Sequence, residues 1–418
     1  MKNLCLMILF MLQIILYGCS AGTNVSKNNN IKFEINGDDL IISKKIIHET
    51  DGSILVTGCT QSALFNNHLT GNMDYFIAKL NKKMNVIFFK QLGKANQYMC
   101  SNSIAVDRAH NIYVIGDIVN RTSNFFITKF SGINGELLWQ YENNNINNNY
   151  GTDVFVTDQN DIYFGGKKEE NNKYDAFYGM VSRVNNCSEM CPVDYNINPN
   201  IKFLGDDSKT ITNIISNNSL QYIYALGNSN QGNVIIYKID KYNNKILDHF
   251  VFKDSNIIFE PQGIIIAKDY LYFTTHNEIN DIYGELSSML WKINFDGQLI
   301  WKKNIKNIST SGVFSLNGIS TCSKNNYLFI TGYTSVPFNQ LFPQIGIHDS
   351  FVVTYDINGN FINYTYWGNL YEINHNSSIV TNKNCISYIL GDTKINNINT
   401  KHNLYIKKWL GPFDSVAK

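Results

Sequence analysis

Residues 103–141 read SIAVDRAHNIYVIGDIVNRTSNFFITKFSGINGELLWQY and contain four short apolar runs separated by polar turns. The runs are Ser103–Asp107, Ile112–Gly116, Phe125–Phe130 and Leu137–Tyr141. They are rich in Ile, Val, Phe and Tyr, which suit a pleated, half-buried strand. Asn134-Gly135 lies between the last two runs, and both residue types accept the positive φ of a tight hairpin. The stretch therefore predicts a four-stranded antiparallel meander, with strands named A to D in chain order.

This meander recurs along the chain when copies are aligned on the Gly that ends strand B. Repeats of about 40 to 50 residues with four strands each indicate a β-propeller, in which every repeat is one blade. Seven copies are found, and Thr replaces the Gly in the fifth. Their B strands are Ile54–Gly58, Ile112–Gly116, Ile162–Gly165, Tyr222–Gly227, Tyr270–Thr274, Tyr327–Gly332 and Ile386–Gly391.

The two ends of the chain complement each other. The last copy lacks strand D, because only a short tail interrupted by Pro412 follows its strand C. One strand is left over at the front, where Ile31–Gly37 precedes the first strand A near Ile41–Ile47. If Ile31–Gly37 pairs with Leu404–Trp409, both exposed edges disappear. We therefore predict an all-β, seven-bladed propeller of four-stranded antiparallel blades over residues 31–418, closed by the N-terminal strand.

Two motifs carry a resemblance to a known family. Thr57-Gly58-Cys59-Thr60-Gln61-Ser62 leads to Asp74-Tyr75-Phe76-Ile77-Ala78-Lys79, and Thr331-Gly332-Tyr333-Thr334-Ser335 leads to Asp349-Ser350-Phe351-Val352-Val353. These motifs resemble the SBBP-type β-propeller repeats of bacterial surface and secreted proteins. In that family, strand B ends in a Thr-Gly-x-Thr-x-Ser-like motif and an Asp opens strand C. The resemblance implies a propeller fold outside the cytoplasm and implies no particular activity.

The N-terminus has the pattern of an export signal. Lys2 precedes an apolar run, Leu4–Tyr17, that is too short to span a membrane. The end of the run, Leu16-Tyr17-Gly18-Cys19, resembles the lipobox of bacterial lipoproteins, in which the Cys after the cleavage site is lipidated. We expect a signal peptide over 1–18, a lipid on Cys19 and a polar tether over 19–30. The alternative is an ordinary secretory signal with a chance Cys.

Charge and the resemblance to lipoproteins together set expectations about location and partners. Lys and Arg total 35 and Asp and Glu total 34, so the net charge is +1 and there is no basic surplus for binding nucleic acid. Residue 20 is Ser rather than Asp, which in such lipoproteins favours the outer membrane or cell surface. We expect a monomer attached to the membrane through its lipid, with an envelope protein as partner.

Eight cysteines include Cys5 in the signal and Cys19 at the anchor. Cys187 and Cys191 lie close together in an insertion between strands C and D of blade 3, so a disulfide between them is expected in an oxidising compartment. The alternative is two free thiols. The pairing of the others, Cys59, Cys100, Cys322 and Cys385, is left open.

The chain contains no local motif of a catalytic, metal or cofactor site. Its eight His residues have no metal-ligand spacing such as His-Glu-x-x-His, and neither a Gly-x-Ser-x-Gly motif nor a phosphate-binding Gly loop occurs. Asp74, Asp175 and Asp349 recur before strand C, where we interpret them as caps of local backbone N–H groups rather than cation ligands. We therefore expect no catalytic residue, metal or cofactor, although a site assembled across blades stays open.

Loop length is the asymmetry that we connect with function. The connections between strands B and C are expected to be long at Thr60–Met73, His276–Ser287, Tyr333–His348 and Asp392–Asn403, in the neighbouring blades 1, 5, 6 and 7. Loops on a rigid scaffold often bind ligands. The blade 6 loop also carries apolar residues that form a candidate binding loop: Pro337, Phe338, Leu341, Phe342 and Pro343.

These patterns favour a lipid-anchored extracytoplasmic propeller that acts as a binding or scaffold protein. Two alternatives remain open. One is a propeller hydrolase or lyase with a site at the central channel, and the other is a subunit of an envelope assembly complex. Acidic and His side chains converging on the channel would favour the enzyme.

Overall fold

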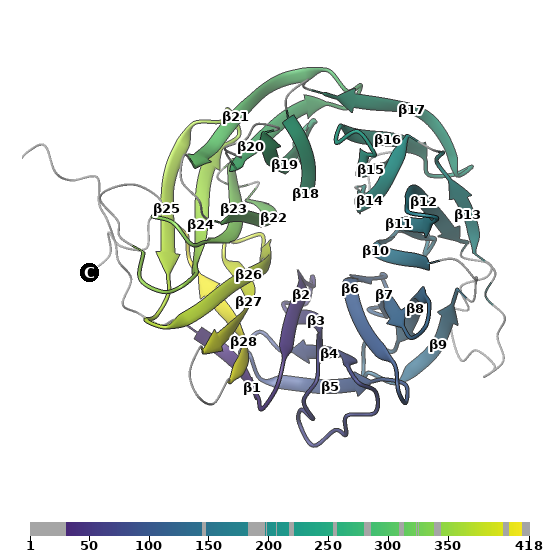
Figure 1. The fold of residues 1–418 in the computed structure, drawn as a ribbon, viewed down its shortest axis with the longest axis vertical. Helices are drawn as coiled ribbons and strands as arrows, with labels where there is room; N and C mark the ends of the chain where they lie inside the picture. Colours follow the sequence, from purple (N-terminus) through teal and green to yellow (C-terminus); the bar gives the residue numbers. More distant parts are fainter. Residues whose placement is uncertain are drawn as a thin grey trace, which may run out of the picture.

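The computed structural model confirms the propeller (Figure 1). Seven four-stranded antiparallel sheets surround a central axis, with strand A of each blade innermost. The structure describes residues 31–411 except 144–147, 183–196, 198, 206, 217–220, 254–256, 280–285, 309–312, 323, 325, 338–343 and 396–400. Within this described part, the chain contains no helix long and apolar enough to cross a membrane.

The strands follow one another blade by blade, from A to D. Blade 1 contains β2 (Ile41–His48), β3 (Ile54–Thr60), β4 (Asp74–Leu80) and β5 (Val86–Leu92). Blade 2 contains β6 (Tyr98–Val106), β7 (Ile112–Val119), β8 (Ser123–Phe130) and β9 (Leu137–Glu142). Blade 3 contains β10 (Asn148–Val156), β11 (Ile162–Glu170), β12 (Lys173–Val181) and β13 (Asn200–Phe203). Blade 4 contains β14 (Ser208–Ile215), β15 (Tyr222–Ser229), β16 (Val234–Asp240) and β17 (Lys245–Phe252).

The remaining three blades complete the ring. Blade 5 contains β18 (Ile257–Ala267), β19 (Tyr270–Ile279), β20 (Leu286–Asn294) and β21 (Leu299–Ile308). Blade 6 contains β22 (Phe314–Cys322), β23 (Tyr327–Thr334), β24 (Asp349–Asp356) and β25 (Phe361–Trp367). Blade 7 contains β26 (Glu372–Thr381), β27 (Ser387–Ile395) and β28 (His402–Trp409), and its outer strand is β1 (Ile31–Gly37).

The predicted closure by the N-terminal strand is confirmed. β1 pairs antiparallel with β28, with Ile35 opposite Leu404 and Gly37 opposite His402. Ile35 is buried among Leu404 and Ile406 of blade 7 and Ile41 of blade 1. The first strand of the chain therefore joins the last one, covers the edge of β28 and becomes the outer strand of blade 7 (Figure 1).

The hydrophobic core lies between the blades. Among the described residues, seven apolar clusters are found, and each spans one pair of neighbouring blades. Between blades 1 and 2, for example, Leu55 and Tyr75 pack with Ile104, Val114 and Phe126. Each blade is thus covered on both faces, which explains why β3 and β4 are buried along their whole length instead of alternating.

The repeat Gly of strand B lies opposite a bulge in strand A. In every blade, a residue of strand A is skipped in the pairing with strand B at this level, and blade 4 skips a second residue, Lys209. A Cβ on Gly58 would overlap the carbonyl oxygen of Ile42, and Gly116 and Gly332 meet the same obstacle. The bulge thus excludes most side chains from this position. In blades 3 and 5 the residue opposite the bulge is Gly166 and Thr275. Each is one position after the residue on which we aligned the repeats, Gly165 and Thr274.

Two of the four predicted long loops are shorter than expected, although their connections remain longer than those in blades 2, 3 and 4. β19 continues to Ile279 and β20 starts at Leu286, while β27 continues to Ile395 and β28 starts at His402, so much of His276–Ser287 and Asp392–Asn403 is strand. Polar residues continue these strands because the ladder is held by backbone hydrogen bonds. The connections at 61–73 and 335–348 are long, as predicted, and belong to blades 1 and 6 on either side of blade 7.

Candidate functional site

The seven bulges place a ring of polar side chains around the central channel. The skipped residue of each strand A lines a cavity of about 370 Å³ on the axis of the propeller. These bulge residues are Lys44, Asn102, Thr152, Thr212, Gln262, Asn317 and Ser377. One is cationic, three are amides and three are hydroxyls, so the channel offers hydrogen-bonding groups at one level in every blade.

Most bulge side chains hold the backbone. The three hydroxyls each donate to a carbonyl oxygen of strand B in their own blade: Thr152 to Gly165 at 3.0 Å, Thr212 to Leu226 at 3.2 Å and Ser377 to Leu390 at 3.3 Å. The two Asn side chains donate to strand A of the next blade: Asn102 to Gly151 at 2.8 Å and Asn317 to Asn376 at 2.6 Å. Gln262 donates to the carbonyl oxygen of Glu260 at 3.4 Å. Six of the seven bulge residues therefore have a structural role.

Lys44 differs from the other six. Its side chain makes no hydrogen bond or ion pair with any residue that the structure describes. Burial lowers the pKa of its ammonium, while the charges of Asp117 and Asp392 act in the opposite direction. The charges of two carboxylates therefore act on a half-buried ammonium, and neither forms an ion pair with it.

A second cavity of about 610 Å³ opens beside Lys44 between blades 6, 7 and 1. It shares Lys44, Asn317 and Ser377 with the channel cavity, so the two form a continuous polar region that we call the channel mouth. Further side chains in its lining include Ser43, Tyr333, His375, Asp392, Lys394 and His402.

A pair of imidazoles lies at this mouth. Nδ1 of His348 is 2.7 Å from Nε2 of His375, so one ring donates and the other accepts. The Tyr333 ring packs against both, with its centroid 4.0 Å from that of His375. Burial, helped by the neighbouring His348, lowers the pKa of His375 to about 4. His375 is therefore neutral at pH 7, as a general base must be.

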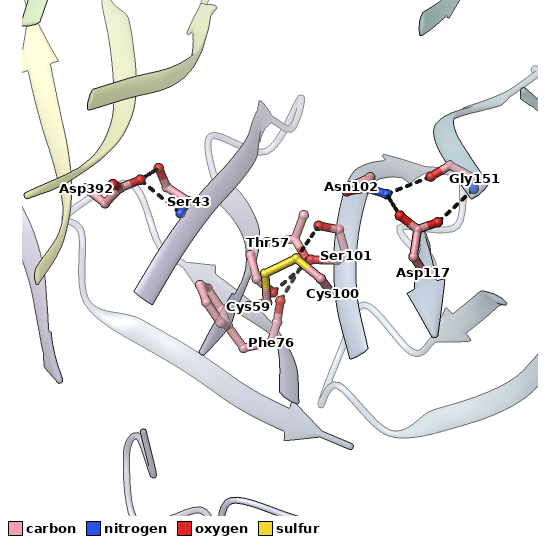
Figure 2. The surroundings of a disulfide bond; sticks show 11 residues. Ser43, Thr57, Cys59, Phe76, Cys100, Ser101, Asn102, Asp117, Gly151 and Asp392 are labelled. Carbon is pink, nitrogen blue, oxygen red and sulfur yellow. Dashed lines mark hydrogen bonds between the residues drawn. A yellow bond between two sulfur atoms is a disulfide. The ribbon is translucent and has the colours of Figure 1, made fainter. Parts of the chain in front are cut away.

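Asp392 stands next to this pair. Its Oδ2 accepts hydrogen bonds from the backbone N–H of Ser43 at 3.1 Å and from the Ser43 hydroxyl at 2.5 Å, which joins blade 7 to blade 1 (Figure 2). Its Oδ1 is 4.0 Å from Nδ1 of His375, beyond hydrogen-bonding distance. Burial raises the pKa of Asp392 to about 6. Oδ1 and Nδ1 are thus spaced so that both can bond to one ligand hydroxyl between them.

Asp117 repeats this arrangement two interfaces further around the ring, between blades 2 and 3. Its two oxygens accept from the Asn102 side chain at 2.7 Å and from the backbone N–H of Gly151 at 2.9 Å (Figure 2). Burial raises its pKa to about 6 as well. Both Asp residues follow the repeat Gly of strand B, so this position links neighbouring blades.

Two disulfides join neighbouring blades within the described part of the chain. Cys59 bonds to Cys100 between blades 1 and 2 (Figure 2), and Cys322 bonds to Cys385 between blades 6 and 7. Cys59, like the two Asp residues, directly follows a repeat Gly. The sequence left these four cysteines unpaired. The expected pair Cys187 and Cys191 lies outside the described residues.

A carboxylate–imidazole cluster at the far end of β2 has a structural role. Oxygen and nitrogen atoms of Glu49, Asp51 and His110 lie within 4.8 Å of one another. However, Oε2 of Glu49 already accepts from the Lys79 ammonium at 3.2 Å and pairs with Nδ1 of His110 at 2.9 Å. Lys79 also donates to the carbonyl oxygen of Gly132, so this network ties blade 1 to blade 2.

Comparison with known proteins supports the fold. A family model described as a beta-propeller repeat, SBBP, matches residues 87–118, which include strands A and B of blade 2. The chain contains an SBBP repeat. No curated protein matches its sequence.

Solved structures resemble the chain at the level of the fold. A hypothetical selenium-binding protein from Sulfolobus tokodaii is 10% identical with a TM-score of 0.51, and the match covers 90% of each chain. A chain of a mitotic checkpoint complex is 7% identical with a TM-score of 0.50, over 92% of this chain and 95% of that one. A periplasmic gluconolactonase from Pseudomonas aeruginosa is 9% identical with a TM-score of 0.46, over 77% and 85%.

The SBBP motif has a direct structural explanation. The first Thr of Thr-Gly-x-Thr donates to strand C: Thr57 to the carbonyl oxygen of Phe76 at 2.7 Å, and Thr331 to that of Phe351 at 2.8 Å. The second Thr caps the following turn, as Thr60 Oγ1 accepts from the Ser62 N–H at 2.9 Å. The Thr residues of the motif therefore fix strand geometry, whereas the residue after the Gly, Tyr333 in blade 6, lines the channel mouth.

The Asp that opens strand C caps the preceding turn, as predicted. Asp74 accepts from the N–H groups of Thr70 and Gly71 at 2.9 and 2.8 Å, and Asp349 accepts from those of Ile345 and Gly346, both at 2.8 Å. Asp175 is an exception, because it is the third residue of β12 and accepts from the N–H of Gly205, after strand D, at 2.9 Å, so the local cap predicted there is not found.

The other predicted site residues are largely outside the described residues. Cys19 lies there, as do Phe338, Leu341, Phe342 and Pro343 of the candidate binding loop. Pro337 is described and exposed. Lipidation and partner binding by this loop therefore stay predictions.

Sequence reasoning missed the channel mouth. His348 and His375 are 27 residues apart on different blades, so no local motif marks them. One signal was present: the residue after the repeat Gly faces the next blade, and in blades 6 and 7 it is Tyr333 and Asp392.

Proposed function

We propose that this chain is an exported, lipid-anchored β-propeller that binds a small polar ligand at its channel mouth. The observation that carries the proposal is the 610 Å³ cavity, to which blades 6, 7 and 1 all contribute polar side chains. Its volume is typical of small-molecule sites, where a few convergent polar groups fix the orientation of the ligand. Nδ1 of His375, Oδ1 of Asp392 and the Lys44 ammonium are the convergent groups here.

Export and anchoring rest on independent features. Leu16, Gly18 and Cys19 match the lipobox pattern, and the residues after them are polar. Disulfides form and persist in oxidising compartments, so Cys59–Cys100 and Cys322–Cys385 support a location outside the cytoplasm.

The paired imidazoles also favour a second candidate, a hydrolase or lyase acting at the same cavity. A neutral imidazole beside a carboxylate is the usual arrangement of a general base. His375, 2.7 Å from His348 and 4.0 Å from Asp392, would take that role.

Ligand-observed NMR with a panel of small polar compounds tests the proposal. The panel contains neutral hexoses, hexuronates, amino acids and short dicarboxylates, tested against wild type, His375→Ala and His249→Ala. We expect at least one class to bind wild type and to bind His375→Ala about 5- to 10-fold more weakly, since a hydrogen bond contributes about 1 kcal/mol. His249 is a matched control because it stacks on Tyr237 in blade 4, away from the mouth.

The same spectra separate the two candidates. An unchanged ligand spectrum after long incubation identifies a binding protein, and new product signals identify an enzyme. If no class binds wild type, or if both His variants bind as well as wild type, the channel mouth is not the site.

Lipidation of Cys19 predicts how the protein partitions between detergent and water. Wild type from native membranes should enter the detergent phase, and Cys19→Ala should be released into the aqueous phase. Equal release of both would show that Cys19 carries no lipid.

A further inference from the structure

Lys44 occupies a position whose other six occupants all donate hydrogen bonds to the backbone. Thr152, Thr212 and Ser377 donate within their own blades, and Asn102 and Asn317 donate to the next blade. A Lys in this ring gives up that structural bond. The substitution therefore places at the channel a positive charge that forms no ion pair with the described residues.

The charged neighbours of Lys44 are already engaged by other groups. Lys45, the next residue of β2, lies 3.9 Å from Oδ1 of Asp153. Oδ2 of Asp392 accepts two hydrogen bonds from Ser43. Asp117 has one partner on each oxygen. Among the described residues, no carboxylate lies within ion-pair distance of the Lys44 ammonium.

A charge removed from water without a partner is unfavourable, and an anion in contact with it restores the lost interaction. We propose that Lys44 binds the carboxylate of a small polyhydroxylated acid at the channel mouth. One cation matches one negative charge, and the two Asp carboxylates nearby disfavour a dianion. The ligand is polyhydroxylated because His375 Nδ1 and Asp392 Oδ1, 4.0 Å apart, can flank a hydroxyl that accepts from the imidazole N–H and donates to the carboxylate.

This inference rests on the proposed function and names the chemical class of its ligand. The test compares D-glucuronate with D-glucuronamide, which keeps every hydroxyl and replaces the carboxylate by a neutral amide. Titration calorimetry at constant ionic strength measures the affinity of both ligands for wild type and three variants. Inorganic phosphate is titrated in the same way as a dianionic probe. Lys44→Met removes the charge, Lys44→Arg keeps it, and Lys83→Met removes an exposed Lys at the outer turn of blade 1.

We expect wild type to bind glucuronate about tenfold or more tightly than glucuronamide, as charge-assisted hydrogen bonds contribute about 1.5–3 kcal/mol. Lys44→Met should lower glucuronate affinity to the level of glucuronamide and leave glucuronamide affinity unchanged. Lys83→Met should behave as wild type, and Lys44→Arg should retain part of the preference. An unchanged melting temperature of Lys44→Met shows that the loss is local.

Three outcomes would overturn this inference. One is a glucuronate preference that survives in Lys44→Met, and another is tighter, Lys44-dependent binding of phosphate. The third is equal affinity of wild type for the two sugars, which rejects the carboxylate anchor but leaves binding at the mouth intact. Failure of every compound in the NMR panel would instead reject the proposed function itself.

Discussion

A chain that begins at Asp38 should melt several degrees lower than one that begins at Asn30, and it should self-associate. The shorter chain lacks β1, whose residues pair with β28 from Ile31 opposite Lys407 to Gly37 opposite His402. It also loses Ile35, which is 3% exposed in the cluster between blades 7 and 1.

The size of this effect follows from opposing terms. Each ladder hydrogen bond contributes about 1 kcal/mol, and burial of an Ile side chain contributes about 1.5–3 kcal/mol. Ordering the backbone of the strand offsets much of this gain, so we expect a net stabilisation of only a few kcal/mol. Removing β1 also exposes the edge of β28, which then pairs with other molecules.

Calorimetric melting and light scattering on the two chains measure both effects. The chain from Asn30 is the matched control, since it differs only by the residues of β1 and its start. Equal melting temperatures together with equal monomer fractions would mean that the ring does not depend on β1 for closure.

Removing either disulfide should lower the free energy of unfolding by about 4 kcal/mol, the loop-entropy value for cross-links of this span. Cys59–Cys100 closes 41 residues of sequence and Cys322–Cys385 closes 63. The first bond ties blade 1 to blade 2 and the second ties blade 7 to blade 6. Each thus fixes one of the two blades at the seam to its neighbour on the other side. The two bonds lie at different interfaces, so their effects should add.

Urea unfolding of Cys59→Ser/Cys100→Ser and Cys322→Ser/Cys385→Ser, each with and without reductant, measures these contributions. Each variant should unfold at a lower urea concentration than wild type, and the quadruple variant at the lowest. A wild-type midpoint that reductant leaves unchanged would contradict the assigned pairs.

The ring was predictable because each blade is a local unit. Apolar runs and hairpin turns repeat within about 50 residues, and the surplus strand Ile31–Gly37 matched the deficit after Leu404–Trp409. The repeat Gly was visible in the sequence as well. The bulge of strand A, which explains why Gly occurs at this position, could be identified only from the pairing register.

Contacts between blades were not predictable from one sequence. Whether Cys59 meets Cys100 or Tyr333 meets His375 depends on how the residue after the repeat Gly faces the next strand A. The ends of strands were also misjudged, since polarity at Asp392 suggested a loop where backbone pairing continues the strand.

A crystal structure of the protein with D-glucuronate is the most direct measurement of the channel mouth as a binding site. We predict that the sugar occupies the cavity between blades 6, 7 and 1. Its carboxylate should lie within hydrogen-bonding distance of the Lys44 Nζ, and a hydroxyl should lie between His375 Nδ1 and Asp392 Oδ1. An empty mouth, or a sugar whose carboxylate points away from Lys44, would contradict the assignment.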